Sequence, residues 1–317
     1  MISFVGAGPG DIELLTVKGQ RLLQEADAVI YDRLVNPLLL FHCKQTCQFI
    51  YVGKTPYQNT MKQGEINRLL LESQQNYPRV VRLKGGDSVI FGRLTEELEA
   101  VAAAGISFEV VPGITAASGA AAYSGVSLTE RGKARSVTFM TGHLKNDDQQ
   151  TFPVFGQEQT ICLYMGMEAL PKFLKHLQQQ GFAADTDIAV ISWGTYGRQQ
   201  KVVGDFTTIQ AKVTQAGMSN PAMAIIGGSV KAEAKFSWFD QLPRFGERLL
   251  LVASKRPTIE ELISFTSQGA DIWWHQVGEK RDRRFDEISE RYLSEQSFCQ
   301  ALFIDEQAKA VYKIEPD

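Results

Sequence analysis

The sequence predicts an α/β protein built mainly on parallel β-sheet. Short runs of β-branched and aromatic residues alternate with stretches of helical periodicity through the first 130 residues, a pattern typical of βαβ units. Glycines or charged residues follow these strand candidates directly, for example at Gly6, Asp32 and Gly53. The chain has 317 residues, which is enough for two domains and a further fraction.

The first block is expected to hold the ligand site. Its strands are predicted at Ile2–Val5, Ala28–Tyr31, Phe49–Val52, Arg79–Leu83 and Phe108–Val111. Helices are predicted between them at Val17–Glu25, Glu65–Ser73, Thr95–Ala104 and Thr115–Ala122. Because ligands of open parallel sheets bind outside the carboxyl ends of the strands, the residues that follow these strands are the candidates for chemistry.

Two further α/β blocks follow. The second has expected strands at Ser136–Thr141, Thr160–Met165, Ile188–Ser192, Lys201–Val203 and Ala222–Ile226, with helices at Glu168–Gln179 and Thr207–Ala216. Its connection Gly142–Gln159 is polar and acidic and is expected to be an exposed, mobile loop. The third reads as strand Arg248–Val252, helix Ile259–Ser267, strand Ile272–His275, helix Phe285–Leu293 and strand Ala301–Ile304. At about 70 residues it is half of a usual domain.

Composition excludes several classes of protein. The net charge is 33 − 36 = −3, with no block of like charge, which disfavours a nucleic-acid partner. Four cysteines in so long a chain do not make a disulfide framework, and the N-terminus shows no secretory leader. The longest uncharged stretch, Val110–Thr129, is too polar and too interrupted by glycine for a membrane span. A soluble cytoplasmic protein without a membrane partner is expected.

His42, Cys43 and Cys47 faintly resemble a metal site. No second pair of ligands follows at the spacing of a zinc site, and the remaining cysteines are isolated in strand-like runs. Buried thiols are therefore the preferred interpretation, and no metal is expected. No GxSxG motif is present either, so a triad hydrolase has no support.

Three glycine-rich turns carry the sharper signals. Gly6–Asp11 looks like a dinucleotide fingerprint, but the third glycine is replaced by Asp11, whose carboxylate would face a pyrophosphate. A ligand-facing loop without phosphate recognition is preferred there to a bare tight turn. Arg82–Asp87 places two glycines and a carboxylate at a strand end, suited to ribose hydroxyls or an ammonium group. Val111–Ser118 is a strand-to-helix turn whose small residues are equally compatible with simple packing.

An acid and a lysine follow two other strands of the first block. Asp32 comes after Ala28–Tyr31, and Lys54 comes after Phe49–Val52. An acid and a cation near one cleft suit proton transfer and carboxylate binding. A plain salt bridge is the alternative, and spacing alone leaves both open.

The order and spacing of these motifs together resemble the uroporphyrinogen-III C-methyltransferases of the tetrapyrrole methylase family. The resemblance covers about residues 1–240 and is carried by VGAGPGD, YDRLV, YVGK, VVRLKGGD, FEVVPGITAASGAAAYSG, SVTFMTGH, LYMGM and NPAMAIIGG. It implies two α/β domains, 1–133 and 134–240, with S-adenosylmethionine in the cleft between them and S-adenosylhomocysteine as product. It also implies a homodimer that transfers two methyl groups to uroporphyrinogen III, giving precorrin-2 for sirohaem or cobalamin.

The resemblance also assigns residues. Asp32 corresponds to the family's proton acceptor, Lys54 to its proton donor and Arg82 to an arginine that acts on the tetrapyrrole. The cofactor shell implied by the family consists of Pro9, Gly85, Gly86, Asp87, Ile90, Thr115, Ala116, Met165, Gly194 and Ala222. Departures from the family pattern stand at Ser88, Leu94, Thr95 and Glu130. They are expected to bear on turnover more than on cofactor binding.

The third block has its own resemblance. The run Gln241–Val252 is similar to the junction at which some bacteria fuse this methylase to uroporphyrinogen-III synthase, so residues 243–317 are interpreted as a synthase-like remnant without cyclising activity. Two alternatives to the main prediction stay open: a methylase of a later precorrin, and a cofactor-binding relic with weakened catalysis.

Overall fold

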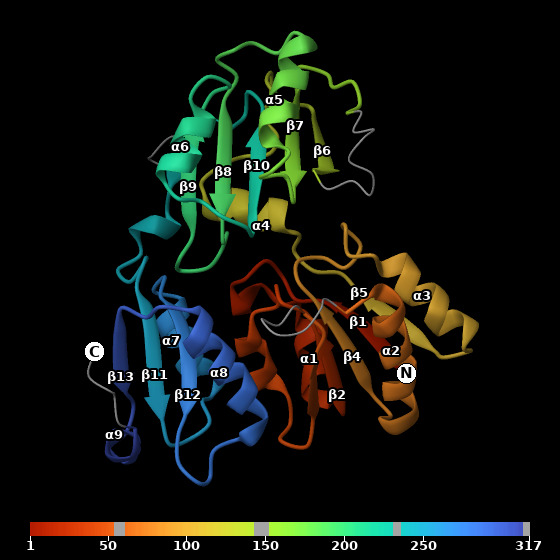
Figure 1. Cartoon of the computed structure of the whole chain (residues 1–317), viewed down its shortest axis with the longest axis vertical. Coiled ribbons are helices and arrows are strands. Elements are labelled where there is room, and N and C mark those ends of the chain that lie inside the picture. The colour runs from red at the N-terminus through yellow and green to blue at the C-terminus, as the bar shows by residue number, and fades with distance from the viewer. Residues whose placement is uncertain (54–60, 143–151, 231–235, 313–317) are drawn as a thin grey trace. The chain divides into compact units, whose positions relative to one another are not determined.

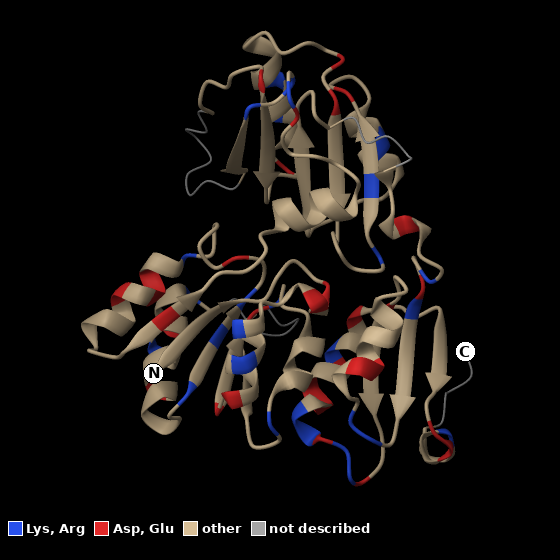
Figure 2. Ribbon diagram, turned by 180° about the vertical axis from the view of Figure 1, so that it is seen from behind, with Lys and Arg blue, Asp and Glu red and all other residues tan. Residues whose placement is uncertain are grey.

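The computed structural model describes residues 1–53, 61–142, 152–230 and 236–312. The chain forms two compact units, one made of residues 1–115 together with 243–317 and the other of residues 116–242. Acidic and basic residues are interleaved over the ribbons of both units (Figure 2). Within the described ranges, no helix combines the length and the apolar character that a bilayer span needs.

The first unit contains a five-stranded parallel sheet in the order β3-β2-β4-β1-β5 (Figure 1). Its strands are β1 (Ile2–Gly6), β2 (Ala28–Tyr31), β3 (Gln48–Tyr51), β4 (Val80–Lys84) and β5 (Phe108–Val111). The connecting helices are α1 (Val17–Glu25), α2 (Gln63–Asn76) and α3 (Leu94–Ala103), with 3-10 helices η1 (Ile12–Leu14) and η2 (Pro37–His42). Because every pair is parallel, all five strands end at one edge.

The two faces of this sheet have separate cores, since successive strand residues point to opposite sides. On one face Val5, Val29 and Leu83 belong to the same buried cluster as the apolar residues of α1 and η2. On the other face Phe4 and Ile30 pack with residues of α2 and α3. Arg82 and Lys84 stand at alternate positions of β4, so both side chains point to the α3 face.

Three turns at the carboxyl edge approach one another so closely that only glycine fits. A Cβ on Gly6 would lie 2.6 Å from the Gly113 nitrogen, and one on Gly113 would lie 2.4 Å from the Gly86 carbonyl oxygen. Gly8 and Gly86, both with positive φ, exchange backbone hydrogen bonds of 3.1 and 2.7 Å. The glycines of the three motifs are thus required for the backbones to meet.

The third block forms a separate three-stranded parallel sheet in the order β12-β11-β13. Its elements are β11 (Arg248–Ala253), α7 (Ile259–Thr266), β12 (Asp271–Gln276), η6 (Arg283–Phe285), α8 (Asp286–Glu295), β13 (Gln300–Phe303) and α9 (Glu306–Val311). Thr258 and Glu261 form a capping box that starts α7. Its buried residues join those of α1 and η2 in one hydrophobic cluster, which is why this block belongs to the first unit.

The second unit is built on a mixed sheet in the order β6-β7-β10-β8-β9, of which only the β6–β7 pair is parallel. Its strands are β6 (Ser136–Thr141), β7 (Gln159–Tyr164), β8 (Ile188–Ser192), β9 (Gln200–Gly204) and β10 (Ala222–Ile226). The helices are α4 (Ala116–Tyr123), α5 (Leu170–Gln179) and α6 (Ile209–Gln215), followed by η5 (Phe239–Gln241). Helices α4 and α5 contribute to different buried clusters.

Most predicted elements lie within one or two residues of the observed ones, but one expectation is wrong and one element lacks a prediction. The Gly142–Gln159 connection is not an exposed loop throughout: Phe152 and Phe155 are buried and pack edge-on against Phe173 of α5. Residues 143–151 lie outside the described ranges. The 3-10 helix η2 was not predicted, although Asn36 caps it and its Leu-rich run is buried.

Replacement of Gly113 by alanine tests the close approach of the turns. We expect Gly113→Ala to lower the free energy of unfolding by about 1–3 kcal/mol, because the new methyl group meets rigid backbone. Urea denaturation measures the change. Gly64→Ala is the matched control: its Cβ meets no atom within 4 Å, so stability should be unchanged or slightly higher. A Gly113→Ala protein as stable as the control would contradict the packing described.

Candidate active site

The predicted site residues of the first unit gather at the carboxyl edge of its sheet. Pro9 follows β1, Asp32 follows β2, and Gly85, Gly86 and Asp87 follow β4. The backbone pairing of Gly8 with Gly86 joins the first and third of these turns. The β1 turn is held from β2 as well, because the Asn36 amide donates to the Gly10 carbonyl at 2.8 Å.

The turn after β4 is bent tightly around Asp87. The Asp87 Oδ1 atom accepts a hydrogen bond from the Val89 backbone at 3.0 Å, and the Ile90 N–H donates to the Asp87 carbonyl at 3.1 Å. Next to it, the Ser88 hydroxyl is buried and has no hydrogen-bond partner among the described residues. This residue is one of the positions that depart from the family pattern, and its hydroxyl adds a buried polar atom to the turn.

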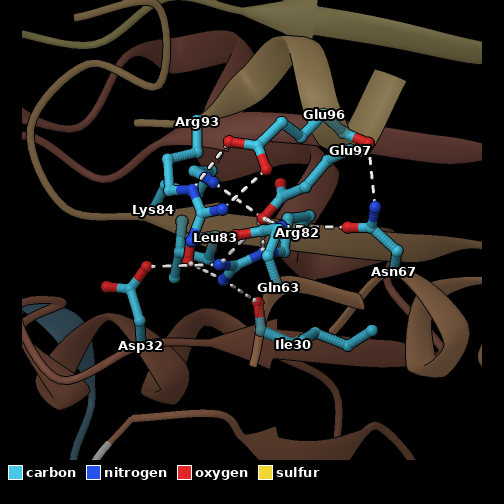
Figure 3. Close-up of polar contacts among 10 residues, drawn as sticks. All are labelled: Ile30, Asp32, Gln63, Asn67, Arg82, Leu83, Lys84, Arg93, Glu96 and Glu97. Carbon is cyan, nitrogen blue, oxygen red and sulfur yellow. Dashed lines mark hydrogen bonds and ion pairs between the residues drawn. The ribbon is translucent and has the colours of Figure 1, made fainter. Parts of the chain in front are cut away.

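A buried ion-pair network lies under the same edge (Figure 3). The Glu97 Oε1 atom accepts hydrogen bonds from Lys84 Nζ at 2.8 Å and from Arg82 Nε and Nη2 at 3.3 Å each. Arg82 Nη2 also lies 3.4 Å from Asp32 Oδ2. The side chains of Arg82, Lys84 and Glu97 are 3, 6 and 0% exposed, whereas that of Asp32 is 31% exposed. Asp32 is therefore the member of the network that a ligand can reach.

Backbone carbonyls complete the surroundings of Arg82. Its Nη1 atom donates to the carbonyls of Ile30 and Leu83 at 3.4 and 3.2 Å. The guanidinium is thus held by protein groups on several sides, and its orientation toward Asp32 is fixed. Burial lowers the pKa of Lys84, an effect that the neighbouring Arg82 reinforces and Glu97 opposes. Burial of both cations depends on the Glu97 carboxylate.

Helices α2 and α3 are tied together above this network. The Gln63 amide donates to Asn67 at 2.9 Å and to Glu97 Oε1 at 3.3 Å, and the Asn67 amide donates to the Glu96 carbonyl at 2.9 Å. Arg93 and Glu96 form an exposed two-pronged ion pair of 2.7 and 2.6 Å. The polar bonds fix the position of α3, and with it the position of Glu97.

The predicted residues of the second unit also lie at one sheet edge. Ala222 pairs with Ser192 of β8, and Met223 pairs with Tyr164 of β7. Met165 and Gly194, which follow these two strands, therefore lie at the same end of the sheet as Ala222. A Cβ on Gly194 would lie 2.8 Å from the Ala120 side chain of α4. The Ala117 N–H of α4 donates to the Tyr164 hydroxyl at 3.1 Å, which brings Ala116, at the start of that helix, to the same region.

Residues with a strained, positive-φ backbone lie beside the predicted site residues of each unit. Five non-glycine residues of the described chain have positive φ: Phe91, Arg93, Met165, Trp193 and Thr195. The first two follow Ile90, and the last two flank Gly194. Such conformations cluster at functional sites because they persist only where the surroundings hold them. The strain is an indication of a site that is independent of the sequence motifs.

Comparison with known proteins gives the family. Residues 1–210 match the model of the Tetrapyrrole (Corrin/Porphyrin) Methylases. The chain belongs to this family. Its α/β architecture agrees with that of the solved relatives described next, which confirms the predicted fold class.

Relatives of this methylase carry two kinds of name. The siroheme synthase of Pseudoalteromonas atlantica is 47% identical over 240 residues, 75% of this chain and 52% of that protein. The uroporphyrinogen-III C-methyltransferase of Bacillus subtilis is 41% identical over 276 residues, 86% of this chain and 57% of that protein. The chain thus spans about half the length of the curated relatives it matches.

A solved relative covers the methylase part. The uroporphyrin-III C-methyl transferase from Thermus thermophilus, complexed with S-adenyl homocysteine, is 34% identical with a TM-score of 0.62. The similarity covers 73% of this chain and 93% of that one. Most of that enzyme therefore has a counterpart in this methylase.

Glu130 and Leu94, two of the residues that depart from the family pattern, make contacts close to their own positions. The Glu130 carboxylate is paired with Lys133 at 2.7 Å, so its charge is compensated within the same turn. Leu94 begins α3 and packs against the core cluster of that sheet face. Lys54, the predicted proton donor, lies outside the described residues. Among the residues that are described, no group of three or more histidine, cysteine or acidic side chains could hold a metal ion.

Glu97 is a site residue that no sequence motif predicts. It stands in the first turn of α3, where an acidic residue is favoured by the helix dipole alone, so nothing marked it as special. A signal for it is present in the sequence. Arg82 and Lys84 stand on one face of a buried strand, and two buried cations require a carboxylate that faces them.

Removal of the Glu97 charge should destabilise this methylase strongly. We expect Glu97→Gln to lower the free energy of unfolding by about 3 kcal/mol, since two buried cations would share only Asp32. The adjacent Glu96→Gln removes an exposed pair, 48 and 53% exposed, and should cost less than about 1 kcal/mol. Urea denaturation of both variants provides the measurement. Equal losses of unfolding free energy in the two variants would show that the buried network stabilises the fold no more than the exposed ion pair does.

Proposed function

We propose that this chain transfers methyl groups from S-adenosylmethionine to uroporphyrinogen III, giving precorrin-2. The observation that carries the proposal is the edge of the first sheet, where the glycine turns and the half-exposed Asp32 come together. Support comes from the Thermus relative, whose name gives the reaction and whose structure holds the cofactor product. The sirohaem pathway is favoured over cobalamin because several relatives are named siroheme synthase.

The cofactor is proposed to bind to the glycine turns. Gly85, Gly86 and Asp87 would contact its ribose and methionine parts, with Pro9 and Ile90 beside them. Thr115, Ala116, Met165, Gly194 and Ala222 are proposed to complete the shell. The fit is supported by the partial exposure of Gly85, Gly86 and Asp87, because glycine carries no side chain and lets a ligand approach the backbone closely. When bound, S-adenosylmethionine supplies a methyl group already activated by the sulfonium charge.

Proton transfer is proposed to fall to Asp32 and Lys54. A reduced pyrrole ring must lose a proton after its carbon is methylated, and an accessible carboxylate can accept it. Arg82 is fully engaged with Glu97, Asp32 and two carbonyls. We therefore assign Arg82 a positioning role: it holds the Asp32 carboxylate in place and acts on the tetrapyrrole through it.

The assembly and location of the enzyme belong to the same proposal. We propose a cytoplasmic homodimer, with methylase domains at 1–133 and 134–240 followed by the block at 243–317. The Bacillus relative supports an inherited connection to this last block, because a match over 86% of the chain must extend into it. Sedimentation of the purified chain gives the oligomeric state directly.

A product analysis tests the activity. Incubation with uroporphyrinogen III and labelled S-adenosylmethionine should give a product that carries two added methyl groups, detected by mass spectrometry. A methylase of later precorrins would leave uroporphyrinogen III unchanged and methylate a precorrin instead. A relic would bind S-adenosylhomocysteine in a calorimeter and methylate neither compound.

Replacement of Asp87 should remove cofactor binding. In Asp87→Ala the bond to the Val89 backbone is lost together with the carboxylate offered to the ligand, so calorimetric affinity for S-adenosylhomocysteine should fall about 100-fold or more. Circular dichroism should remain that of the folded protein. Asp185→Ala, at an exposed position of the other unit, should bind like the parent. Unchanged affinity in Asp87→Ala would remove this loop from the cofactor site.

Replacement of Asp32 should remove turnover instead. Asp32→Asn keeps the size of the side chain but not its basicity, so kcat should fall about 100-fold or more while S-adenosylhomocysteine still binds. Asp27→Asn is a suitable control, because Asp27 precedes β2 at the opposite edge of the sheet. If Asp32→Asn turned over at the parental rate, another group would have to accept the proton.

A further inference from the structure

The block at 243–317 is attached to the methylase domain by arginines that bind backbone carbonyls. Arg256 Nη2 donates to the carbonyls of Phe41 and Cys43 at 2.8 and 2.7 Å. Arg284 Nη1 donates to those of Lys44 and Cys47 at 2.9 and 2.7 Å. These carbonyls lie at the end of η2 and in the turn after it, where a helix leaves its acceptors without intrahelical partners. Charged donors therefore bind there strongly.

Asp282 holds both arginines in the orientation that lets them bind these carbonyls. Its carboxylate accepts from Arg256 Nη1 at 3.1 Å and from Arg284 Nε at 2.8 Å. Burial disfavours the charged form of Asp282, but the bonds to Arg284 and the charge of Arg256 outweigh it and hold the pKa below its usual range. All three side chains are less than 20% exposed. The contact is therefore an interface of buried and paired charges.

Aromatic packing closes the same interface. Phe41 of η2 stacks on Phe285 of η6 with ring centroids 4.1 Å apart and an angle of 7°. Phe49 of β3 meets Phe285 edge-on at 5.2 Å. Parallel and edge-on contacts of this kind fix the angle at which two elements meet. Helix α8, which follows Phe285, is thereby held against the ends of β2 and β3.

Arg291 of α8 reaches those strand ends. Its guanidinium carbon lies 3.8 Å from the centroid of the Tyr51 ring, and its charge is close enough to Tyr31 to act on the pKa of that phenol. The two tyrosines are the last residues of β3 and β2, with ring centroids 5.3 Å apart. Burial raises the pKa of Tyr31 to about 12, although Arg291 opposes this. Both tyrosines therefore stay neutral and can donate a hydrogen bond at neutral pH.

The tyrosines in turn contact the residues around Asp32. A Cβ on Gly53 would lie 2.3 Å from the Tyr51 hydroxyl and 2.9 Å from the Arg33 nitrogen. The Tyr51 side chain thus folds back over Gly53, the residue before Lys54, beside the backbone that carries Asp32. Tyr31 is bonded directly to Asp32 in the chain. A shift of either ring would therefore displace the backbone at Asp32 and at Gly53.

We propose that the block at 243–317 serves as an intramolecular clasp for the methyl-transfer site, with Arg291 as a positioning residue. It acts through Tyr31 and Tyr51 on the segments that carry Asp32 and lead to Lys54. The inference rests on the proposed function of those segments. It assigns the block a role in methylation that requires no chemistry of its own.

Steady-state kinetics of full-length variants test the clasp. Arg291→Met keeps the length of the side chain and removes its charge and its donors. We expect kcat with uroporphyrinogen III to fall about tenfold, while KM and the affinity for S-adenosylhomocysteine change less than about twofold, because misplacement of a reacting group costs turnover. Arg291→Lys keeps a cation over the Tyr51 ring and should recover most of the rate.

Two further variants separate positioning from simple stability. Arg283→Met alters an exposed arginine of the same block and should behave like the parent. Tyr51→Leu should also lower kcat, and combining it with Arg291→Met should give less than the product of the two losses, because both act through one contact. All rates are expressed per folded site, counted by S-adenosylhomocysteine titration.

The outcomes distinguish the inference from the activity on which it rests. A parental enzyme that transfers no methyl group refutes the proposed function. An active parent together with an equally active Arg291→Met refutes the clasp alone. The clasp is likewise refuted if the rate per folded site is unchanged and only the amount of folded protein falls, since Arg291 would then be merely structural.

Discussion

The buried carboxylate of Glu97 is the interaction on which the site of this methylase depends. Two cations, Arg82 and Lys84, stand on one face of a central strand and are almost wholly removed from water. Such charges are tolerated only when they are paired and hydrogen-bonded. Glu97 supplies the pairing from α3, and Arg82 extends it to Asp32. The position of the proposed base therefore depends on the docking of a helix far from it in sequence.

The backbone around this network is equally constrained. Three glycine turns meet so closely that a methyl group at Gly6 or Gly113 would collide with a neighbouring main chain. Phe91 and Arg93, which follow the turn after β4, adopt positive φ although they carry side chains. Strain of this kind persists when surrounding contacts over-determine the conformation. In the first unit, Asp32, Gly85, Gly86 and Asp87 stand directly after strands that are hydrogen-bonded into one parallel sheet.

The block at 243–317 is packed against the first sheet of the same unit. Arg256 and Arg284 bind carbonyls at the end of η2 and in the turn after it, and Phe41 stacks on Phe285 across the same contact. The result is a hydrophobic cluster shared by residues more than 200 positions apart. A segment held this firmly can influence the strand ends beneath it without supplying a reactive group.

The α/β class, most strands and helices along the chain and the glycine turns could be predicted from the sequence, because periodicity and turn chemistry are local properties. The motifs also led to the methylase family, which the comparisons then showed. Tertiary structure alone decided that Arg82 faces inward to Asp32 and Glu97, that Phe152 and Phe155 are buried, and that Arg291 covers Tyr51. Each of these contacts joins residues distant in the chain, and their meeting follows from how sheets and helices pack rather than from any local pattern.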